Sequence, residues 1–190
     1  MFTGCGKTSF ITALAGELEY SICVLNLSER GLSDDRLNHL MSIAPTQSII
    51  LLEDIDAAFT TRQETAVQKQ AYDGLNRVTF SGLLNMLDGV ASTEARILFM
   101  TTNYLDRLDP ALIRPGRVDY KQLVDYTTPS QMKKAFINFY PDEDILADNF
   151  VNKVIEKGVP VSMAMLQGFF LRYKNNAKNA IDNTEKIWEK

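Results

Sequence analysis

The sequence predicts an α/β fold, in which a parallel sheet covered by helices on both faces precedes a small all-helical domain. Two observations predict this fold. Short apolar runs alternate with stretches of helical spacing, and strand-like runs stop after Thr127. Such alternation is typical of parallel sheets, because each crossover between parallel strands needs a connection as long as a helix. We therefore expect an α/β domain at residues 1–127 and a helical domain at residues 128–190.

The elements of the first domain follow in a regular order. Buried strands are expected at Ser21–Leu27, Ser48–Asp56 and Arg96–Asn103, with a weaker fourth at Tyr120–Tyr126. Helices are expected at Lys7–Leu18, Asp34–Ala44 and Thr79–Leu87. Ser33 or Asp34 is the expected N-cap of the second helix. The segment Thr60–Arg77 is polar and weakly periodic, so we expect an exposed loop there.

The second domain has only helical spacing. A helix is expected to begin beside Pro129, because proline is favoured in the first turn of a helix. Three more helices are expected at Ile145–Lys157, Ser162–Tyr173 and Ala177–Trp188. The aromatic residues of Phe136–Tyr140 and Phe169–Tyr173, together with Trp188, are expected to form its core.

Composition argues against several classes of protein, although a local basic patch stays open. A net charge of −4 and a pI near 5.1 give no electrostatic footprint for nucleic acid. Cys5 and Cys23 are too few for a disulfide framework, and they fit a reducing compartment. No stretch of the sequence approaches the roughly 18 consecutive apolar residues of a membrane helix.

The chain opens with GCGKT, which matches the end of the phosphate-binding pattern G-x-x-x-x-G-K-[ST]. In that pattern backbone amides surround the phosphates, the lysine reaches the outer phosphates, and the hydroxyl binds magnesium. The expected nucleotide-binding residues are Gly4, Cys5, Gly6, Lys7, Thr8 and Ser9. Met1 stands where the first glycine belongs, so a chance match is the alternative.

The run ILLEDID predicts the second half of a nucleoside triphosphatase site. A buried strand that ends in adjacent acids supplies one acid to Mg²⁺ and another to the attacking water. We expect Glu53 to hold Mg²⁺ together with Thr8, and Asp54 to polarise the water. The usual order is Asp followed by Glu, so the shorter Asp54 stands at the position of the base. Positioning the water then needs a shifted backbone or a slower reaction. An acidic strand end that caps the next helix is the alternative.

A polar strand end and two arginines occur in TTNYLDRLDPALIRPGRVD. Asn103 is expected to orient the attacking water, with a simple turn residue as the alternative. Asp109 and Pro110 are typical of a helix N-cap and first turn. Arg114 and Arg117 flank Pro-Gly on a rigid corner, where a guanidinium can act as an arginine finger on a neighbouring subunit. Surface ion pairs are the alternative for both.

These motifs together resemble the AAA ATPases, and the arginine segment resembles their second region of homology. The strings TALAGEL, LSDDRLNHL, LLEDIDAAF and GLNRVTFSGLLNMLDGVASTEARI, with the arginine segment, resemble one group of them more closely. That group is the mitochondrial inner-membrane AAA chaperones, which move the folded Rieske iron–sulfur subunit to complete respiratory complex III. The resemblance runs from Gly4 to about Tyr173 and includes the Glu53–Asp54 order. One further feature agrees with it: where protein-threading rings carry an aromatic loop after the second strand, this chain has NLSERGLSDDRL, with no aromatic residue.

The resemblance implies a P-loop ATPase sheet, a helical lid, and hydrolysis of ATP with Mg²⁺. It implies a homo-oligomeric ring, heptameric in the family, in which Arg114 and Arg117 act on the adjacent subunit. The implied partners are the Rieske protein and the complex III precursor, and no nucleic acid. The implied location is the mitochondrial inner membrane, with the ATPase domain facing the matrix.

The resemblance further implies an N-terminally truncated chain that lacks the first strand of the sheet. In the family that strand lies between the strand ending at Asn103 and the strand near Leu123, so its loss leaves backbone groups unpaired. Family members also carry a transmembrane helix and a middle domain before the ATPase domain. We therefore expect an isoform, a partial gene model or a fragment. Besides an ATPase chaperone module, a non-catalytic partner that docks onto full-length subunits stays open, and the acidic pI disfavours a DNA-handling ATPase.

Overall fold

The computed structural model describes residues 3–29, 31–58, 78–90 and 95–189. The loop expected at Thr60–Arg77 lies outside these residues. The chain divides into two compact units, of which one runs over Thr8–Gln122 and the other combines Phe2–Lys7 with Leu123–Lys190. The domain boundary expected after Thr127 stays a prediction.

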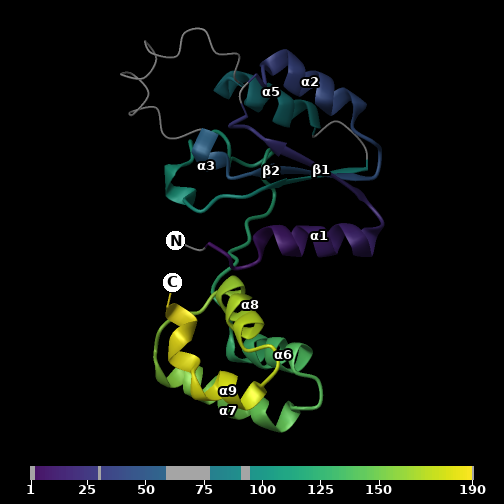
Figure 1. Ribbon diagram of the computed structural model, residues 1–190. Helices are drawn as coiled ribbons and strands as arrows, with labels where there is room; N and C mark the ends of the chain where they lie inside the picture. The colour runs from purple at the N-terminus through teal and green to yellow at the C-terminus, as the bar shows by residue number, and fades with distance from the viewer. Residues whose placement is uncertain (1–2, 30, 59–77, 91–94, 190) are drawn as a thin grey trace. The chain divides into compact units, whose positions relative to one another are not determined.

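A parallel sheet of three strands forms the middle of the first unit (Figure 1). Its strands are β1 (Ser21–Asn26), β2 (Ser48–Glu53) and β3 (Arg96–Met100), in the order β1-β2-β3. In the register of the sheet, Leu52 of β2 lies between Leu25 and Met100. Five of the six residues of β2 are buried, as expected of a central strand covered on both faces. The predicted α/β class with a parallel sheet is confirmed.

Helices cover the two faces of this sheet (Figure 1). They are α1 (Lys7–Leu18) on one side, and α2 (Asp34–Ile43) and α5 (Phe80–Val90) on the other. Alternate side chains of β2 pack into two hydrophobic cores, one on each face of the sheet, because successive residues of a strand face opposite sides. Ile49 and Leu51 join the core that includes Ile11 of α1. Ile50 and Leu52 join the larger core, to which α2 and α5 contribute.

The starts of α2 and α5 are tied together by Asp34. Ser33 is the N-cap of α2 and accepts a hydrogen bond from the backbone N–H of Arg36 at 3.2 Å. Asp34 accepts instead from the backbone N–H and the hydroxyl of Thr79, at 2.7 and 2.6 Å. The Asp34 carboxylate lies so close to Gly82 that a Cβ there would come within 2.2 Å of it. Of the two expected caps, Ser33 is therefore the right one.

Strands β2 and β3 both end earlier than expected. The predicted strand Ser48–Asp56 ends at Glu53, because Asp54 has a φ of 46° that no strand accommodates, and α3 (Ile55–Ala58) follows. The predicted strand Arg96–Asn103 ends at Met100. The 3-10 turn η2 (Leu105–Arg107) comes soon after it.

The fourth strand expected at Tyr120–Tyr126 is wrong. A strand needs a hydrogen-bonded neighbour, and in the described residues β3 pairs only with β2. Tyr120 and Leu123 are accordingly 78% and 64% exposed.

The helix expected at Asp109–Pro110 is only a turn. Asp109 does accept a hydrogen bond from the backbone N–H of Ala111 at 2.9 Å, as an N-cap would. No helix follows it in the structure. Pro115 explains why, because proline lacks the N–H that a helix needs and disfavours helical geometry at the preceding residue.

The second unit is helical as predicted. Its elements are α6 (Pro129–Phe139), α7 (Asp144–Glu156), α8 (Met163–Arg172), α9 (Ala177–Asp182) and the 3-10 turn η3 (Thr184–Trp188). Thr128 and Gln131 form a capping box at α6, with Pro129 in its first turn. The helix expected at Ala177–Trp188 is divided at Asn183. The Asn183 side chain donates to the carbonyl oxygen of Asn179 at 2.9 Å and so competes with the helical backbone.

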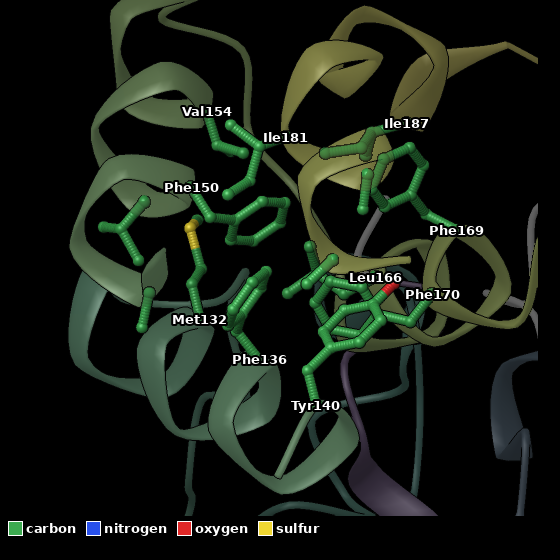
Figure 2. Close-up of a cluster of buried hydrophobic side chains, with 14 of the residues drawn as sticks. Met132, Phe136, Tyr140, Phe150, Val154, Leu166, Phe169, Phe170, Ile181 and Ile187 are labelled. Carbon is green, nitrogen blue, oxygen red and sulfur yellow. The ribbon is translucent and has the colours of Figure 1, made fainter. Parts of the chain in front are cut away.

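Aromatic side chains form the centre of this unit (Figure 2). The rings of Phe136 and Phe150 are stacked with their centroids 5.0 Å apart, and Phe170 meets Phe136 edge-on at 6.0 Å. All three side chains are almost fully buried. Trp188 packs against the same cluster and is partly buried. The expected aromatic core is confirmed.

Candidate active site

The loop before α1 depends on two glycines. Gly4 and Gly6 have φ angles of 74° and 101°, which residues with a Cβ rarely adopt. Gly4 also packs against α8, where its carbonyl oxygen accepts from the backbone N–H of Ala164 at 3.0 Å. Helix α1 begins at Lys7, immediately after the loop, and Ser9 lies in its first turn. The first backbone N–H groups of a helix have no partner within the helix, so they favour an anion there.

Cys5 sits between the two glycines. Burial raises the pKa of its thiol, although the nearby Lys7 charge opposes this effect. A thiol with a raised pKa is less reactive, because the thiolate is the nucleophile. Cys5 therefore fits the loop as a small side chain better than as a reactive group.

Thr8 and Glu53 meet where α1 begins and β2 ends. The Thr8 hydroxyl donates to Glu53 Oε1 at 2.7 Å. Two oxygen ligands at this separation suit Mg²⁺, which takes oxygen donors and usually keeps several waters. Within the described residues no group of three His, Cys, Asp or Glu side chains gathers that would hold a metal. A hydroxyl and one carboxylate fit an ion that keeps several water ligands.

Asp54 and Asn103 form a second pair at the same edge of the sheet. Asn103 Nδ2 donates to Asp54 Oδ1 at 3.3 Å. Thr101 holds the turn that presents Asp54, since its hydroxyl accepts from the Asp54 N–H at 3.2 Å and its carbonyl from the Ile55 N–H at 3.0 Å. A carboxylate and an amide are therefore side by side after β2 and β3, where a water molecule can contact both.

Asp56 is a third acid at this edge, and sequence reasoning missed its role. Its Oδ1 accepts from the Thr102 hydroxyl at 2.5 Å and from the Asn103 backbone N–H at 3.2 Å. It thereby fixes the residue that contacts Asp54. The signal in the sequence was the second aspartate of ILLEDID, two residues beyond Asp54.

The two arginines differ in their surroundings. Arg114 is exposed. The Arg117 side chain is only 6% exposed, and its Nε and Nη2 each donate to an Asp88 carboxylate oxygen at 2.7 Å. Its Nη1 donates to the Ala111 carbonyl at 2.8 Å. The hydrogen bonds from Arg117 hold the pKa of Asp88 below its usual value. No sequence pattern pointed to Asp88.

The comparisons with known families agree with this geometry. Residues 2–126 match the family described as "ATPase family associated with various cellular activities (AAA)". Residues 129–186 match the ATPase lid domain of the family described as "Mitochondrial chaperone BCS1-like". The chain belongs to the AAA ATPase family.

This AAA ATPase is similar to several curated proteins. It is 59% identical to "Mitochondrial chaperone BCS1" of Homo sapiens and 58% identical to that of Bos taurus, in each case over 185 residues. It is 50% identical over 184 residues to "Probable mitochondrial chaperone bcs1" of Schizosaccharomyces pombe. These alignments cover 97% of this chain but only 44%, 44% and 40% of the three relatives. The chain therefore spans less than half the length of the curated relatives it matches.

The comparisons confirm the family and the lid that the sequence motifs predicted. Membership of the AAA family implies nucleotide binding, usually with Mg²⁺. In the part of the chain that the structure describes, no helix has the length and apolar character needed to cross a membrane.

Proposed function

We propose that this AAA ATPase chain hydrolyses ATP as the motor module of a chaperone. One observation carries the proposal. Thr8 meets Glu53, and Asp54 meets Asn103, where β2 and β3 end. In open parallel sheets ligands bind at the carboxyl ends of the strands, so these four side chains lie where a nucleotide is expected.

Each residue has a distinct part in the proposed reaction. The backbone N–H groups from Gly4 to Ser9 surround the phosphates, and the Lys7 ammonium binds the outer ones. Thr8 and Glu53 hold Mg²⁺, which supplies positive charge against the phosphate oxygens. Asp54 draws a proton from the attacking water, and Asn103 orients that water.

The geometry at Asp54 supports its assignment as the base. Aspartate is one methylene shorter than glutamate, so its carboxylate reaches less far from the same strand end. The left-handed backbone at Asp54, with φ of 46°, redirects the side chain after β2. A shifted backbone and a slower reaction were the two expected consequences of the inverted acid order, and the positive φ of Asp54 with its contact to Asn103 supports the first.

We further propose that the chain works in a homo-oligomeric ring, with seven subunits by family resemblance. Arg114 is exposed and is the group offered to the γ-phosphate of the neighbouring subunit. By the same resemblance its partners are the Rieske iron–sulfur protein and the complex III precursor, at the matrix face of the mitochondrial inner membrane. The relatives from Homo sapiens and Bos taurus are named mitochondrial chaperones, which supports a mitochondrial setting.

The alternative is a non-catalytic chain that only docks onto full-length subunits. The intact contacts of Thr8 with Glu53 and of Asp54 with Asn103 favour the ATPase. The decisive experiment measures ATP turnover of the protein, with Lys7→Ala as the variant and Lys178→Ala as the control. Lys178 is exposed on α9. We expect Lys7→Ala to lower kcat by about 100-fold or more, and unchanged turnover would refute the proposal.

A further inference from the structure

Arg117 is committed to its own chain. Three of its nitrogen atoms donate hydrogen bonds, two to the Asp88 carboxylate and one to the Ala111 carbonyl. A guanidinium that binds a carboxylate with two parallel hydrogen bonds is held in one orientation, because its donors form a rigid fork. The low exposure of the side chain, 6%, shows that the group is covered as well as paired.

The segment that Arg117 closes, residues 109–118, contains no helix or strand, and its buried Leu112 anchors it in the main core. It contains short turns, in which Leu112 N–H donates to the Asp109 carbonyl at 2.9 Å and Val118 N–H to the Arg114 carbonyl at 3.2 Å. Because Arg117 lies near one end of this segment and Ala111 near the other, their hydrogen bond joins the two turns. Asp88 attaches both to α5, which packs in the main core.

Arg114 lies in the chain between Ala111 and Arg117, which are joined by a hydrogen bond. Its own side chain is exposed, and it is separated from Arg117 by Pro115 and Gly116. The position of Arg114 on the surface therefore depends on the turns around it. Leu112 of the same segment stays anchored in the main core, so release of Arg117 from Asp88 would loosen the turns around Arg114 without detaching the segment.

We propose that Arg117 is a positioning residue of its own subunit, which acts with Asp88 to hold the turn that presents Arg114. Arg117 does not then act as a second finger on the neighbour. The role of Arg114 rests on the proposed function, whereas the hold on the turn does not.

The hold on the turn is tested by hydrogen exchange in the protein. We expect Asp88→Ala and Arg117→Ala each to speed exchange of the Leu112 and Val118 amides by about tenfold, because local opening becomes easier. Arg114→Ala is the control and is expected to leave both rates unchanged. Unchanged exchange in the Asp88 and Arg117 variants would overturn the proposal, whatever the activity of the protein.

The effect on the reaction is tested by a double-mutant cycle in ATP turnover. We expect Asp88→Ala and Arg117→Ala each to lower kcat by about 10- to 100-fold with little change in KM, since misplacing a reacting group mainly affects the transition state. The double variant is expected to lose no more than either single variant.

A finger role for Arg117 predicts a different result. Asp88→Ala would then release Arg117 and preserve kcat, while Arg117→Ala would abolish turnover, and this outcome overturns the proposal. Asp148→Ala is the matched control, because Asp148 forms an exposed ion pair with Lys133 in the second unit. Persistent turnover in Lys7→Ala would instead refute the proposed function, and the exchange experiment would still decide the role of Arg117.

Discussion

Asp54 occupies a backbone conformation that few residues accept. Its φ of 46° lies in the left-handed region, which aspartate and asparagine tolerate better than other residues with a Cβ. Exchange of Asp54 for asparagine therefore keeps the backbone and the shape of the side chain, and removes only the charge. This allows the base to be tested apart from the fold.

Asp54→Asn is expected to lower kcat by about 10²- to 10⁴-fold, because the amide cannot accept a proton from water. Nucleotide affinity and melting temperature are expected to stay close to those of the parent protein. Asp142→Asn is the matched control, since Asp142 also has a positive φ, of 73°, and is exposed in the second unit. A variant at Asp54 that keeps full turnover would exclude this residue as the base.

Asp56 acts on the site through Asn103. Asp56→Ala removes the carboxylate that accepts from the Thr102 hydroxyl and from the Asn103 N–H, in a partly buried place. We expect a loss of about 1–3 kcal/mol in the free energy of unfolding. We also expect a lower kcat, because Asn103 loses its fixed position beside Asp54.

Urea titration and steady-state kinetics of Asp56→Ala test both effects. Asp106→Ala is the control, because Asp106 is exposed in η2. Loss of stability with kcat unchanged would show that Asp56 supports the fold and not the site.

At the scale of elements, the sequence predicted what depends on local pattern. Helix α1 has the predicted bounds, and the three strands begin at the predicted residues. The far end of β2 was placed too late because a side-chain pattern does not reveal a positive φ such as that of Asp54. The far end of β3 was also placed too late, since the strand ends at Met100. The strand expected at Tyr120–Tyr126 failed because pairing depends on a neighbouring strand and not on the segment itself.

The contacts within the site show the same division. The residue types at Thr8, Glu53 and Asn103 were read from motif spacing, because the carboxyl ends of parallel strands meet at one edge. The pairing of Arg117 with Asp88 was not readable, since nothing in either local pattern links positions 29 residues apart. Only the tertiary structure brings these two residues together.

The packing of α2 against α5 depends on the absence of a side chain at Gly82. A Cβ there would lie 2.2 Å from the Asp34 carboxylate, which holds the first turn of α5. Gly82→Ala is expected to reduce the free energy of unfolding by about 1–3 kcal/mol, although alanine favours a helix by about 1 kcal/mol.

Gly16→Ala in α1 is the matched control, because a Cβ at Gly16 would meet nothing within 4 Å. It is expected to stabilise the protein by about 0.5–1 kcal/mol. Opposite signs of the two changes in urea titration would confirm the close approach, and stabilisation by both would contradict it.

At the scale of the whole molecule, the two units have separate hydrophobic cores. Separate cores allow separate responses to solution conditions, because burial of apolar surface is the main favourable term in each. The second unit also contains its own fluorescent side chain. Trp188 is the only tryptophan of the chain and packs against the aromatic core of that unit.

Tyr140 makes the second unit sensitive to alkali. Burial raises the pKa of its phenol to about 12, and its hydroxyl donates to the Tyr173 carbonyl at 3.1 Å. The folded state therefore favours the protonated phenol more than the unfolded state does, where the pKa is about 10. This contribution to stability is complete below pH of about 10 and is lost as the pH rises toward about 12.

The fluorescence of Trp188 during urea titration should show this loss directly. We expect the free energy of unfolding of the second unit to fall between pH of about 10 and 12 in the parent protein. In Tyr140→Phe the free energy of unfolding is expected to fall less over the same interval, because phenylalanine has no proton to lose. This variant also lacks the hydrogen bond to Tyr173 at every pH. Tyr120→Phe is the control, since Tyr120 is 78% exposed and is not part of this core. Equal slopes in the parent protein and Tyr140→Phe would show that the buried phenol does not set the alkaline limit of this unit.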